Sequence, residues 1–367
     1  MERWSRQTIL PELGVAGQQR LLRAKVLCIG TGALGSPATM YLAAAGVGTL
    51  VIVDPDLVES SNLQRQILHG ESYRGLPKVE SAAQRLRDLH PDIRLELHAC
   101  RFTPDNAESL SEGCDLIVDG SDNFPTRFLT NDIAYFRKIP LVHAAVQRFE
   151  GQMTVFAPHR GGPCYRCLLP TMPAPGSIPN CAESGVMGAL PGVMGSLQAM
   201  EALKLIAGIG QPAIGKMLYY HSLTNHFRQI QLHPDPACRL CSSHADITSV
   251  HNSETLQSST CTMNHIPSIT VQELYQKLSA NPGLCLVDVR EPQEHADAAI
   301  QGSTLVPLAT VPDHLHDWSP DQEIFIHCKA GGRSARACDF LQQQGFTKVT
   351  NITGGMDAWI AAGLPLA

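Results

Sequence analysis

The sequence has 367 residues, of which 44% are hydrophobic and 17% charged, a composition typical of globular proteins long enough for two domains. The formal net charge of -6 gives no reason to expect a nucleic-acid partner. Residues 1–10 carry charges where a secretory signal peptide needs an apolar core, which favours a cytoplasmic location. The most apolar long stretch, residues 185–208, contains Pro191, Glu201 and Lys204, so it predicts a buried loop and helix and no membrane span. Twelve cysteines in a cytoplasmic chain indicate metal binding or sulfur chemistry before disulfides.

A glycine-rich turn near the N-terminus is the strongest local signal. Residues 26–54 have the pattern of a strand, a turn, a helix and a second strand. The first turn has the G-x-G-x-x-G spacing, in Gly30, Gly32 and Gly35. Glycines without a Cβ let the backbone approach a phosphate, and the amides at the helix start favour its negative charge. Asp54 ends the second strand, where an acid can hold the hydroxyls of a ribose, so the unit predicts a nucleotide site.

Strands and helices alternate through this part of the chain. The expected strands are 26–29, 49–53, 93–97, 115–119 and 141–145, and the expected helices are 36–46, 78–90, 105–110 and 127–137. This alternation, with nearly continuous apolar runs in the strands, predicts a doubly wound, Rossmann-like α/β sheet. Residues 60–66 (SSNLQRQ) are too polar and too few for another strand.

Polar residues follow the ends of the expected strands. Functional residues of open α/β sheets gather at the carboxyl ends of the strands, an edge that the 60–66 segment and Lys78 can also reach. A dehydrogenase needs only the glycine turn and one acid, and the chain lacks a substrate-side catalytic set for hydride transfer. Extra cations and a second carboxylate suit nucleotidyl transfer from ATP, in which Mg²⁺ shares the charge on the phosphates. The expected nucleotide ligands are Gly30, Gly32, Gly35, Asp54, Asn62, Arg65, Gln66, Lys78, Asp122 and Asn123, and the catalytic Asp122 is the expected Mg²⁺ ligand.

Seven segments, in chain order, resemble the MoeB/ThiF group of ubiquitin-activating-like enzymes. They are GTGALG, VDPDLVESSNLQRQ, LPKVESA, DGSDNFPTR, EGQMTVF, PCYRCL and GSLQAMEALKLIAG, within residues 3–241. The resemblance implies adenylation of the C-terminal glycine of a ubiquitin-like sulfur-carrier protein ending in Gly-Gly. It implies a ribose contact for Asp54, phosphate contacts for Arg65 and Lys78, and Mg²⁺ at Asp122. The family often has GGGGLG where this chain has GTGALG.

The same resemblance assigns roles to two further residues. Arg6 matches the family arginine that reaches into the partner protomer's active site, which implies a catalytic role and a homodimer. Cys181 follows a loop rich in proline and glycine. A lone loop cysteine is more often inert, but this one matches the family cysteine on the mobile loop near the adenylate, which implies catalysis.

Two C-x-x-C pairs indicate a metal site. They are Cys164 with Cys167 and Cys238 with Cys241, both in expected loops. Paired knuckles with this spacing predict a tetrahedral Zn²⁺ site, whose role is structural because all four positions are filled by protein. Redox motifs and free buried cysteines are the alternatives.

The composition then shifts and divides the chain. Residues 246–264 are rich in Ser, Thr, His and Asn, which predicts a flexible linker between a domain at 1–245 and a second at 265–367. The second domain contains a loop at the end of a buried strand and before a helix, formed by Cys328, Lys329, Ala330, Gly331, Gly332 and Arg333. Amides at a helix start lower the pKa of a thiol and cradle an anion.

The length of this loop separates two readings. Four residues lie between Cys328 and Arg333, fewer than in a cysteine phosphatase, so the loop suits one sulfur atom better than a phosphate. With VDVREPQEH and GGMDAW, residues 265–367 closely resemble a single rhodanese domain, which implies a persulfide on Cys328. Arg290 and Trp359 are expected to be structural.

The two halves resemble fused MoeB–rhodanese (MoeZ-like) proteins. This resemblance implies an adenylyltransferase and sulfurtransferase that uses ATP, Mg²⁺ and Zn²⁺ to convert the carrier's terminal glycine into a thiocarboxylate. A cysteine desulfurase or thiosulfate is the expected sulfur donor. The alternative is an activator that transfers its ubiquitin-like protein onward through a Cys181 thioester, with the rhodanese domain as a binding module.

Overall fold

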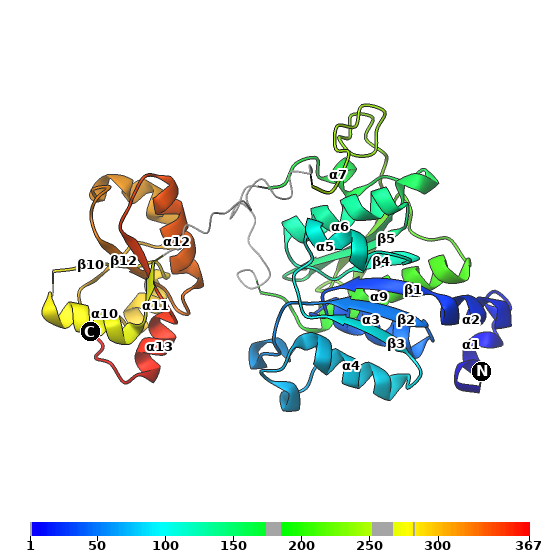
Figure 1. The fold of residues 1–367 in the computed structure, drawn as a ribbon, viewed down its shortest axis with the longest axis horizontal. Coiled ribbons are helices and arrows are strands. Elements are labelled where there is room, and N and C mark those ends of the chain that lie inside the picture. The colour runs from blue at the N-terminus through cyan, green and yellow to red at the C-terminus, as the bar shows by residue number, and fades with distance from the viewer. Residues whose placement is uncertain (1, 174–184, 252–266, 282) are drawn as a thin grey trace. The chain divides into compact units, whose positions relative to one another are not determined.

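The computed structural model describes residues 2–173, 185–251, 267–281 and 283–367 (Figure 1). The chain divides into two compact units, with the division between Ser258 and Ser259. Ile247 and Val250, near the end of the first unit's described part, are 3% and 1% exposed and pack into its core. Residues 252–264 of the expected linker lie outside the described residues. Within the described ranges, no helix combines the length and the apolarity needed to cross a membrane.

The first unit is built on an eight-stranded sheet in the order β3-β2-β1-β4-β5-β6-β7-β8. Its strands are β1 (Lys25–Ile29), β2 (Thr49–Val53), β3 (Arg94–His98), β4 (Leu116–Asp119), β5 (Leu141–Gln147), β6 (Glu150–Phe156), β7 (Lys216–His221) and β8 (His226–Gln231). Strands β1 to β5 are parallel, and β6, β7 and β8 extend the sheet as antiparallel neighbours. The strand order reverses between β1 and β4, which makes their carboxyl ends the topological switch point where ligands bind in such sheets.

Helices cover both faces of the parallel strands (Figure 1). They are α1 (Ser5–Thr8), α2 (Gly14–Arg23), α3 (Gly35–Ala44), α4 (Lys78–Leu89), α5 (Pro104–Leu110), α6 (Phe124–Arg137), α7 (Tyr165–Leu168) and α9 (Ala189–Ala207). Side chains alternate along each strand, so Val26 and Cys28 of β1 join a core with α3, α4 and α9. Leu27 and Ile29 join the opposite core with α5 and α6. Each fully buried aliphatic side chain contributes about 1.5–3 kcal/mol.

The prediction of a doubly wound sheet is confirmed, with two differences in detail. Helix α6 begins at Phe124, three residues earlier than expected, because Asn123 caps it and Pro125 occupies its first turn. The antiparallel strands β6 to β8 were not predicted. Strand β8 is exposed at nearly every position, so it lacks the apolar alternation from which a strand is read.

The second unit contains a five-stranded parallel sheet in the order β11-β10-β12-β13-β9. The strands are β9 (Ser268–Ile269), β10 (Cys285–Asp288), β11 (Ser303–Leu305), β12 (Ile324–His327) and β13 (Val349–Ile352). The helices are α10 (Val271–Ala280), α11 (Pro292–Asp297), α12 (Gly332–Gln343) and α13 (Gly355–Ala361), with a 3-10 helix at Leu308–Asp317. Trp359 is 2% exposed and donates its indole N–H to the Pro365 carbonyl, and buried Arg290 pairs with Asp288, so both act as structural residues here.

Candidate active sites and metal centre

The glycine turn forms the switch-point edge of the first sheet. Gly30 has φ +83°, a left-handed conformation that glycine adopts without steric cost. A Cβ on Gly35 would lie 1.9 Å from the Gly30 carbonyl oxygen, so the start of α3 packs directly onto β1 only without a side chain. A Cβ on Gly30 would lie 3.2 Å from the Gly120 carbonyl oxygen, which brings the segment after β4 against the turn.

Asp54 is held tightly by the same turn. Its Oδ2 accepts hydrogen bonds from the Thr31 amide (2.7 Å) and the Thr31 hydroxyl (2.9 Å), and its Oδ1 accepts one from the Asp56 amide (3.0 Å). Asp54 is only 3% exposed. The second strand end is therefore fixed to the glycine turn by the carboxylate expected to contact ribose.

His69 hydrogen-bonds to the glycine turn, and the sequence did not predict this role. Its Nε2 lies 3.0 Å from the Thr31 carbonyl oxygen and its Nδ1 3.0 Å from the Ser81 hydroxyl. Because a carbonyl only accepts, Nε2 carries the proton and Nδ1 accepts from Ser81. Burial lowers the pKa of His69, which agrees with a neutral ring.

The cations expected to bind phosphate, Lys78 and Arg65, are paired with protein groups. Lys78, 4% exposed, places its Nζ 2.9 Å from Asp56 Oδ2. Arg65 donates to the Ser61 carbonyl and, at 3.0 Å, to the side-chain oxygen of Asn62. Gln66 is buried, and its amide nitrogen would lie 3.6 Å from a Cβ on Gly32.

Asp122 and Asn123 follow β4 and differ in how available their side chains are to a ligand. Asp122 is exposed, so its carboxylate is accessible to a cation. Asn123 is exposed too, but its side-chain oxygen accepts a hydrogen bond from the Thr126 amide (3.0 Å), so here it serves as the N-cap of α6. Arg127 donates to the Ser121 carbonyl (3.2 Å) and fixes the short segment that carries Asp122.

A buried polar network below this segment was not predicted. Asp119 Oδ1 accepts from the Ser121 hydroxyl (2.6 Å), and Oδ2 lies 2.8 Å from His143 Nδ1. Burial opposes ionisation of Asp119, but the His143 hydrogen bond and charge hold its pKa below the usual range. Gln198 of α9 donates to the Asp119 carbonyl (2.7 Å). His143 lies in none of the quoted segments, and only the apolar strand around it indicates a buried polar residue. Gln198 lies in the GSLQAMEALKLIAG segment, but no role was predicted for it from the sequence.

One further expected catalytic residue, Arg6, is not brought to this edge by any contact in the described part of the chain. Arg6 is exposed on α1, at the surface of the first unit. Cys181 lies outside the described residues. The structure also contains a cavity of about 300 Å³ at the opposite edge of the sheet, lined by Arg20, Asp115 and Arg160 among others, so it is separate from the glycine turn.

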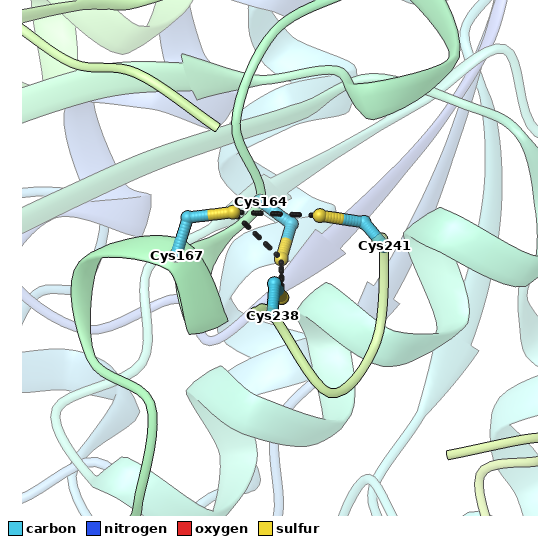
Figure 2. Close-up of side chains that lie close together, drawn as sticks. All are labelled: Cys164, Cys167, Cys238 and Cys241. Atoms are coloured by element: carbon cyan, nitrogen blue, oxygen red, sulfur yellow. Dashed lines mark hydrogen bonds between the residues drawn. The ribbon is translucent and has the colours of Figure 1, made fainter. Parts of the chain in front are cut away.

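The four cysteines of the C-x-x-C pairs converge on one point (Figure 2). The Sγ atoms of Cys164 and Cys238 lie 3.5 Å apart, those of Cys167 and Cys241 3.4 Å apart, and those of Cys164 and Cys167 3.8 Å apart. In a tetrahedral site with Zn–S bonds of about 2.3 Å the sulfur atoms are about 3.8 Å apart. The donor set therefore fits zinc in number, type and spacing.

A buried ion pair anchors the first of these knuckles. Arg166, between the two cysteines, donates to both carboxylate oxygens of Asp132 in α6 at 2.8 Å. Both side chains are at most 1% exposed, and the guanidinium lies 4.7 Å above the Phe128 ring. The amide of Tyr165 also donates to the Asn131 side chain (2.7 Å). These contacts position the knuckle on the parallel part of the fold.

The Cys328 loop in the second unit is a thiol surrounded by hydrogen-bond donors. Cys328, 1% exposed, follows β12, and its Sγ lies 3.1 Å from the Gly331 amide nitrogen and 3.4 Å from Ser334 Oγ. Burial by itself raises the pKa of this thiol, but hydrogen bonds from Ser334, Gly331 and Ala330 outweigh it and hold the pKa below its usual value.

The loop is braced on both sides by residues outside its own motif. Arg333, expected to be part of the persulfide loop, donates to both oxygens of Glu294 at 2.7 Å. The amides of Met356 and Asp357 donate to the Cys328 and Lys329 carbonyls. A Cβ on Gly355 would lie 2.3 Å from the Cys328 carbonyl oxygen, which explains the second glycine of GGMDAW.

These features define a class of protein: an α/β nucleotide-binding unit with a four-cysteine metal site, joined to a unit that presents an activated thiol. The chain belongs to the ThiF family, whose model matches residues 4–240. A second model, the rhodanese-like domain, matches residues 270–362. The sequence resemblance to both families is thereby confirmed.

Curated relatives match nearly the whole chain. The probable adenylyltransferase/sulfurtransferase MoeZ of Mycobacterium tuberculosis is 40% identical over 97% of this chain and 92% of its own length. The adenylyltransferase and sulfurtransferase MOCS3 of Mus musculus is 39% identical over 98% of this chain and 85% of its own. The SAMP-activating enzyme E1 of Haloferax volcanii is 48% identical over 66% of this chain and 88% of its own.

Solved structures support the fold of the first unit. The crystal structure of Escherichia coli MccB with ATP aligns with a TM-score of 0.56 at 22% identity, covering 65% of this chain and 74% of that one.

Proposed function

We propose that this protein is an adenylyltransferase and sulfurtransferase that converts the C-terminal glycine of a ubiquitin-like sulfur-carrier protein into a thiocarboxylate. The observation that carries the proposal is the presence on one chain of both reactive centres, a glycine turn with flanking carboxylates and cations and a donor-lined cysteine. An adenylation site alone has no use for an activated thiol, and a sulfurtransferase alone has no use for a nucleotide site.

The first centre activates the carboxylate. The carrier's terminal oxygen attacks the α-phosphorus of ATP, and pyrophosphate leaves with the electron pair of the broken P–O bond. The glycine turn with the start of α3 holds phosphate, Lys78 and Arg65 neutralise its charge after exchanging their protein partners, and Asp54 contacts ribose. Asn62, Gln66 and Asn123 complete the nucleotide's surroundings. The accessible carboxylate of Asp122 fits Mg²⁺, a hard cation that prefers oxygen ligands and supplies charge neutralisation when bound.

The second centre transfers sulfur. A donor such as thiosulfate or a cysteine desulfurase leaves a sulfur atom on Cys328 as a persulfide, stabilised by the amides of Gly331 and its neighbours. The terminal persulfide sulfur attacks the adenylated carbonyl carbon, and AMP leaves. A second thiol attacks the Cys328 sulfur of the resulting acyl disulfide, the S–S bond breaks, and the carrier leaves as the thiocarboxylate. The disulfide formed between that thiol and Cys328 is then reduced by a thiol reductant from solution. Cys181, outside the described residues, is the proposed catalytic cysteine of the first unit: the persulfide attacks either the adenylate directly or a thioester first formed on Cys181, and both routes give the acyl disulfide.

The remaining parts of the proposal concern assembly. Four cysteines with near-tetrahedral spacing would hold one structural Zn²⁺ ion. Exposed Arg6 would act in the site of a second copy, which makes the protein a homodimer.

The domain limits are proposed at 1–251 for the first unit and 265–367 for the second. The first limit is later than the 245 expected from composition, because Ile247 and Val250 of the expected linker pack into the core of the first unit. The location is proposed to be cytoplasmic.

The test uses wild type, Cys328→Ala and Asp122→Ala with a ubiquitin-like carrier ending in Gly-Gly. Asp122→Ala should lose carrier-dependent exchange of pyrophosphate into ATP. Cys328→Ala should keep exchange, lose thiosulfate sulfurtransfer, and leave the carrier's intact mass without the increase from oxygen to sulfur. Thiocarboxylate formation by Cys328→Ala at the wild-type rate would refute the role of the second centre. Attachment of the carrier to a protein amine, with no oxygen-to-sulfur increase in the mass of the free carrier, would support the alternative activator that works through a Cys181 thioester.

A further inference from the structure

The hydrogen bonds on Asp54 limit what this carboxylate can still accept. A carboxylate offers about four lone-pair sites. Two on Oδ2 are occupied by the amide and hydroxyl of Thr31, and one on Oδ1 by the Asp56 amide. About one acceptor site therefore remains, on Oδ1.

A nucleotide with a full ribose presents two neighbouring hydroxyls as donors. An acid at the end of the second strand satisfies both only if two of its acceptor sites are free. In this chain the Thr31 hydroxyl uses one of them. To place both ribose hydroxyls on Asp54, the nucleotide must displace the Thr31 hydroxyl and break a hydrogen bond to a charged group.

Thr31 is also held in place from behind. Its carbonyl accepts hydrogen bonds from His69 Nε2 and from the Ser36 hydroxyl, both at 3.0 Å, and the residue is fully buried. The backbone of Thr31 is therefore fixed on both sides, and its hydroxyl remains next to Asp54. A residue without a hydroxyl at this position would keep the hydrogen bond from its backbone amide to Asp54 and would leave the fold of the turn unchanged.

We propose that Thr31 is a specificity-determining residue that restricts Asp54 to one ribose hydroxyl of the bound nucleotide. This inference rests on the proposed use of ATP by the first unit. Its consequence is a relaxed ribose preference: removal of the hydroxyl that Asp54 does not contact costs the wild-type protein little affinity. Removal of the ribose hydroxyl that Asp54 does contact costs a charge-assisted hydrogen bond.

The experiment measures equilibrium binding of ATP, 2′-deoxy-ATP and 3′-deoxy-ATP with Mg²⁺ by titration calorimetry, on the full chain. Wild type should bind one deoxynucleotide nearly as tightly as ATP and the other more weakly. Thr31→Ala frees the second acceptor site and the space in front of it. It should bind ATP more tightly, by several-fold to on the order of tenfold, and penalise both deoxynucleotides.

Two matched variants separate the hydroxyl from general effects. Thr31→Ser keeps the hydroxyl and should reproduce the wild-type ranking of the three nucleotides. Thr130→Ala removes another fully buried threonine hydroxyl, which donates to the Thr126 carbonyl within α6, and should leave the ranking unchanged. Thermal melting of each variant checks that it is folded.

Several results would overturn the inference. Wild type that penalises both deoxynucleotides equally would mean that Asp54 accepts both hydroxyls with Thr31 in place. Wild type that penalises neither would mean that Asp54 does not contact ribose. An identical ranking in Thr31→Ala and Thr31→Ser would exclude the hydroxyl as the cause. Wild type that binds no ATP at all would refute the proposed adenylation itself, and is thereby distinguishable from the other outcomes.

Discussion

At the scale of single residues, side chains expected to meet ligands already have protein partners. Lys78 is paired with Asp56, Arg65 with Asn62, and Arg333 with Glu294. A buried or half-buried cation without a partner is costly, so the fold supplies one, and a ligand must offer stronger contacts to replace it. The Arg333 hydrogen bond lowers the pKa of Glu294 to about 2, so this pair stays ionised at neutral pH.

The reactivity of Cys328 can be tested through Ser334. The Ser334 hydroxyl carries one proton and lies 3.4 Å from Cys328 Sγ and 2.7 Å from the side-chain oxygen of Asn351. Because hydrogen bonds from Ser334 are among those that lower the pKa of Cys328, Ser334→Ala should raise it. The pH midpoint of Cys328 alkylation by iodoacetamide, followed peptide by peptide, should move to higher pH.

The control for this experiment is Ser303→Ala in the same unit. Its hydroxyl donates to the Ile300 carbonyl and does not contact the loop. An unshifted midpoint in Ser334→Ala would mean that the backbone amides alone set the reactivity of the thiol.

At the scale of elements, the knuckle that carries Cys164 and Cys167 depends on α6. The Arg166–Asp132 pair is fully buried, so each charge depends on the other for its solvation. The pair connects a short helix, α7, to one of the longest helices of the parallel region.

Breaking this pair should be expensive. Asp132→Ala leaves Arg166 charged and buried, so we expect a loss of about 3–5 kcal/mol in unfolding free energy, measured by urea denaturation. Asp246→Ala is the matched control, since Asp246 pairs with Arg239 at the surface, where an ion pair contributes about 0–1 kcal/mol. Equal losses in both variants would contradict the assigned role of the buried pair.

The metal site gives a second prediction at this scale. Purified protein should contain one zinc per chain, and Cys164→Ser should lose the metal together with thermal stability. Cys114→Ser is the control, because Cys114 is a buried cysteine of the same unit outside the cluster. Metal analysis and melting curves provide the readouts. A Cys164→Ser protein with its full zinc content would place the metal elsewhere.

At the scale of the whole molecule, the proposed homodimer implies that active sites are shared between copies. Arg6 is exposed on α1, so its guanidinium is accessible to a second copy of the chain. Arg6→Ala and Asp122→Ala homodimers should both be inactive in pyrophosphate exchange. Heterodimers of the two should regain one working site, with intact Asp122 from one chain and intact Arg6 from the other.

A mixture of Lys78→Ala and Asp122→Ala is the matched control for this complementation. Both residues belong to the same chain's site, so neither site of that heterodimer is restored. A failure of the Arg6 mixture to regain activity, with heterodimers present by native mass spectrometry, would refute a role for Arg6 across the interface.

The sequence by itself determined whatever depends on short spacing. The glycine turn, the two C-x-x-C pairs and the six-residue Cys328 loop are local patterns, because a turn, a knuckle or a strand-to-helix loop is formed by neighbours along the chain. The alternation of strands and helices likewise predicted the parallel sheet, since each buried strand is a short apolar run between amphipathic helices.

Tertiary structure alone decided which distant groups meet. The Thr31–Asp54, Asp132–Arg166 and Glu294–Arg333 contacts each join residues more than twenty positions apart, and the role of each residue depends on that partner. The pairing of the antiparallel strands β6 to β8 was also decided at this level, and for β8 the reason is clear, because an exposed strand leaves no apolar period in the sequence. Partner choice over such separations is set by packing of the whole core, which no local pattern records.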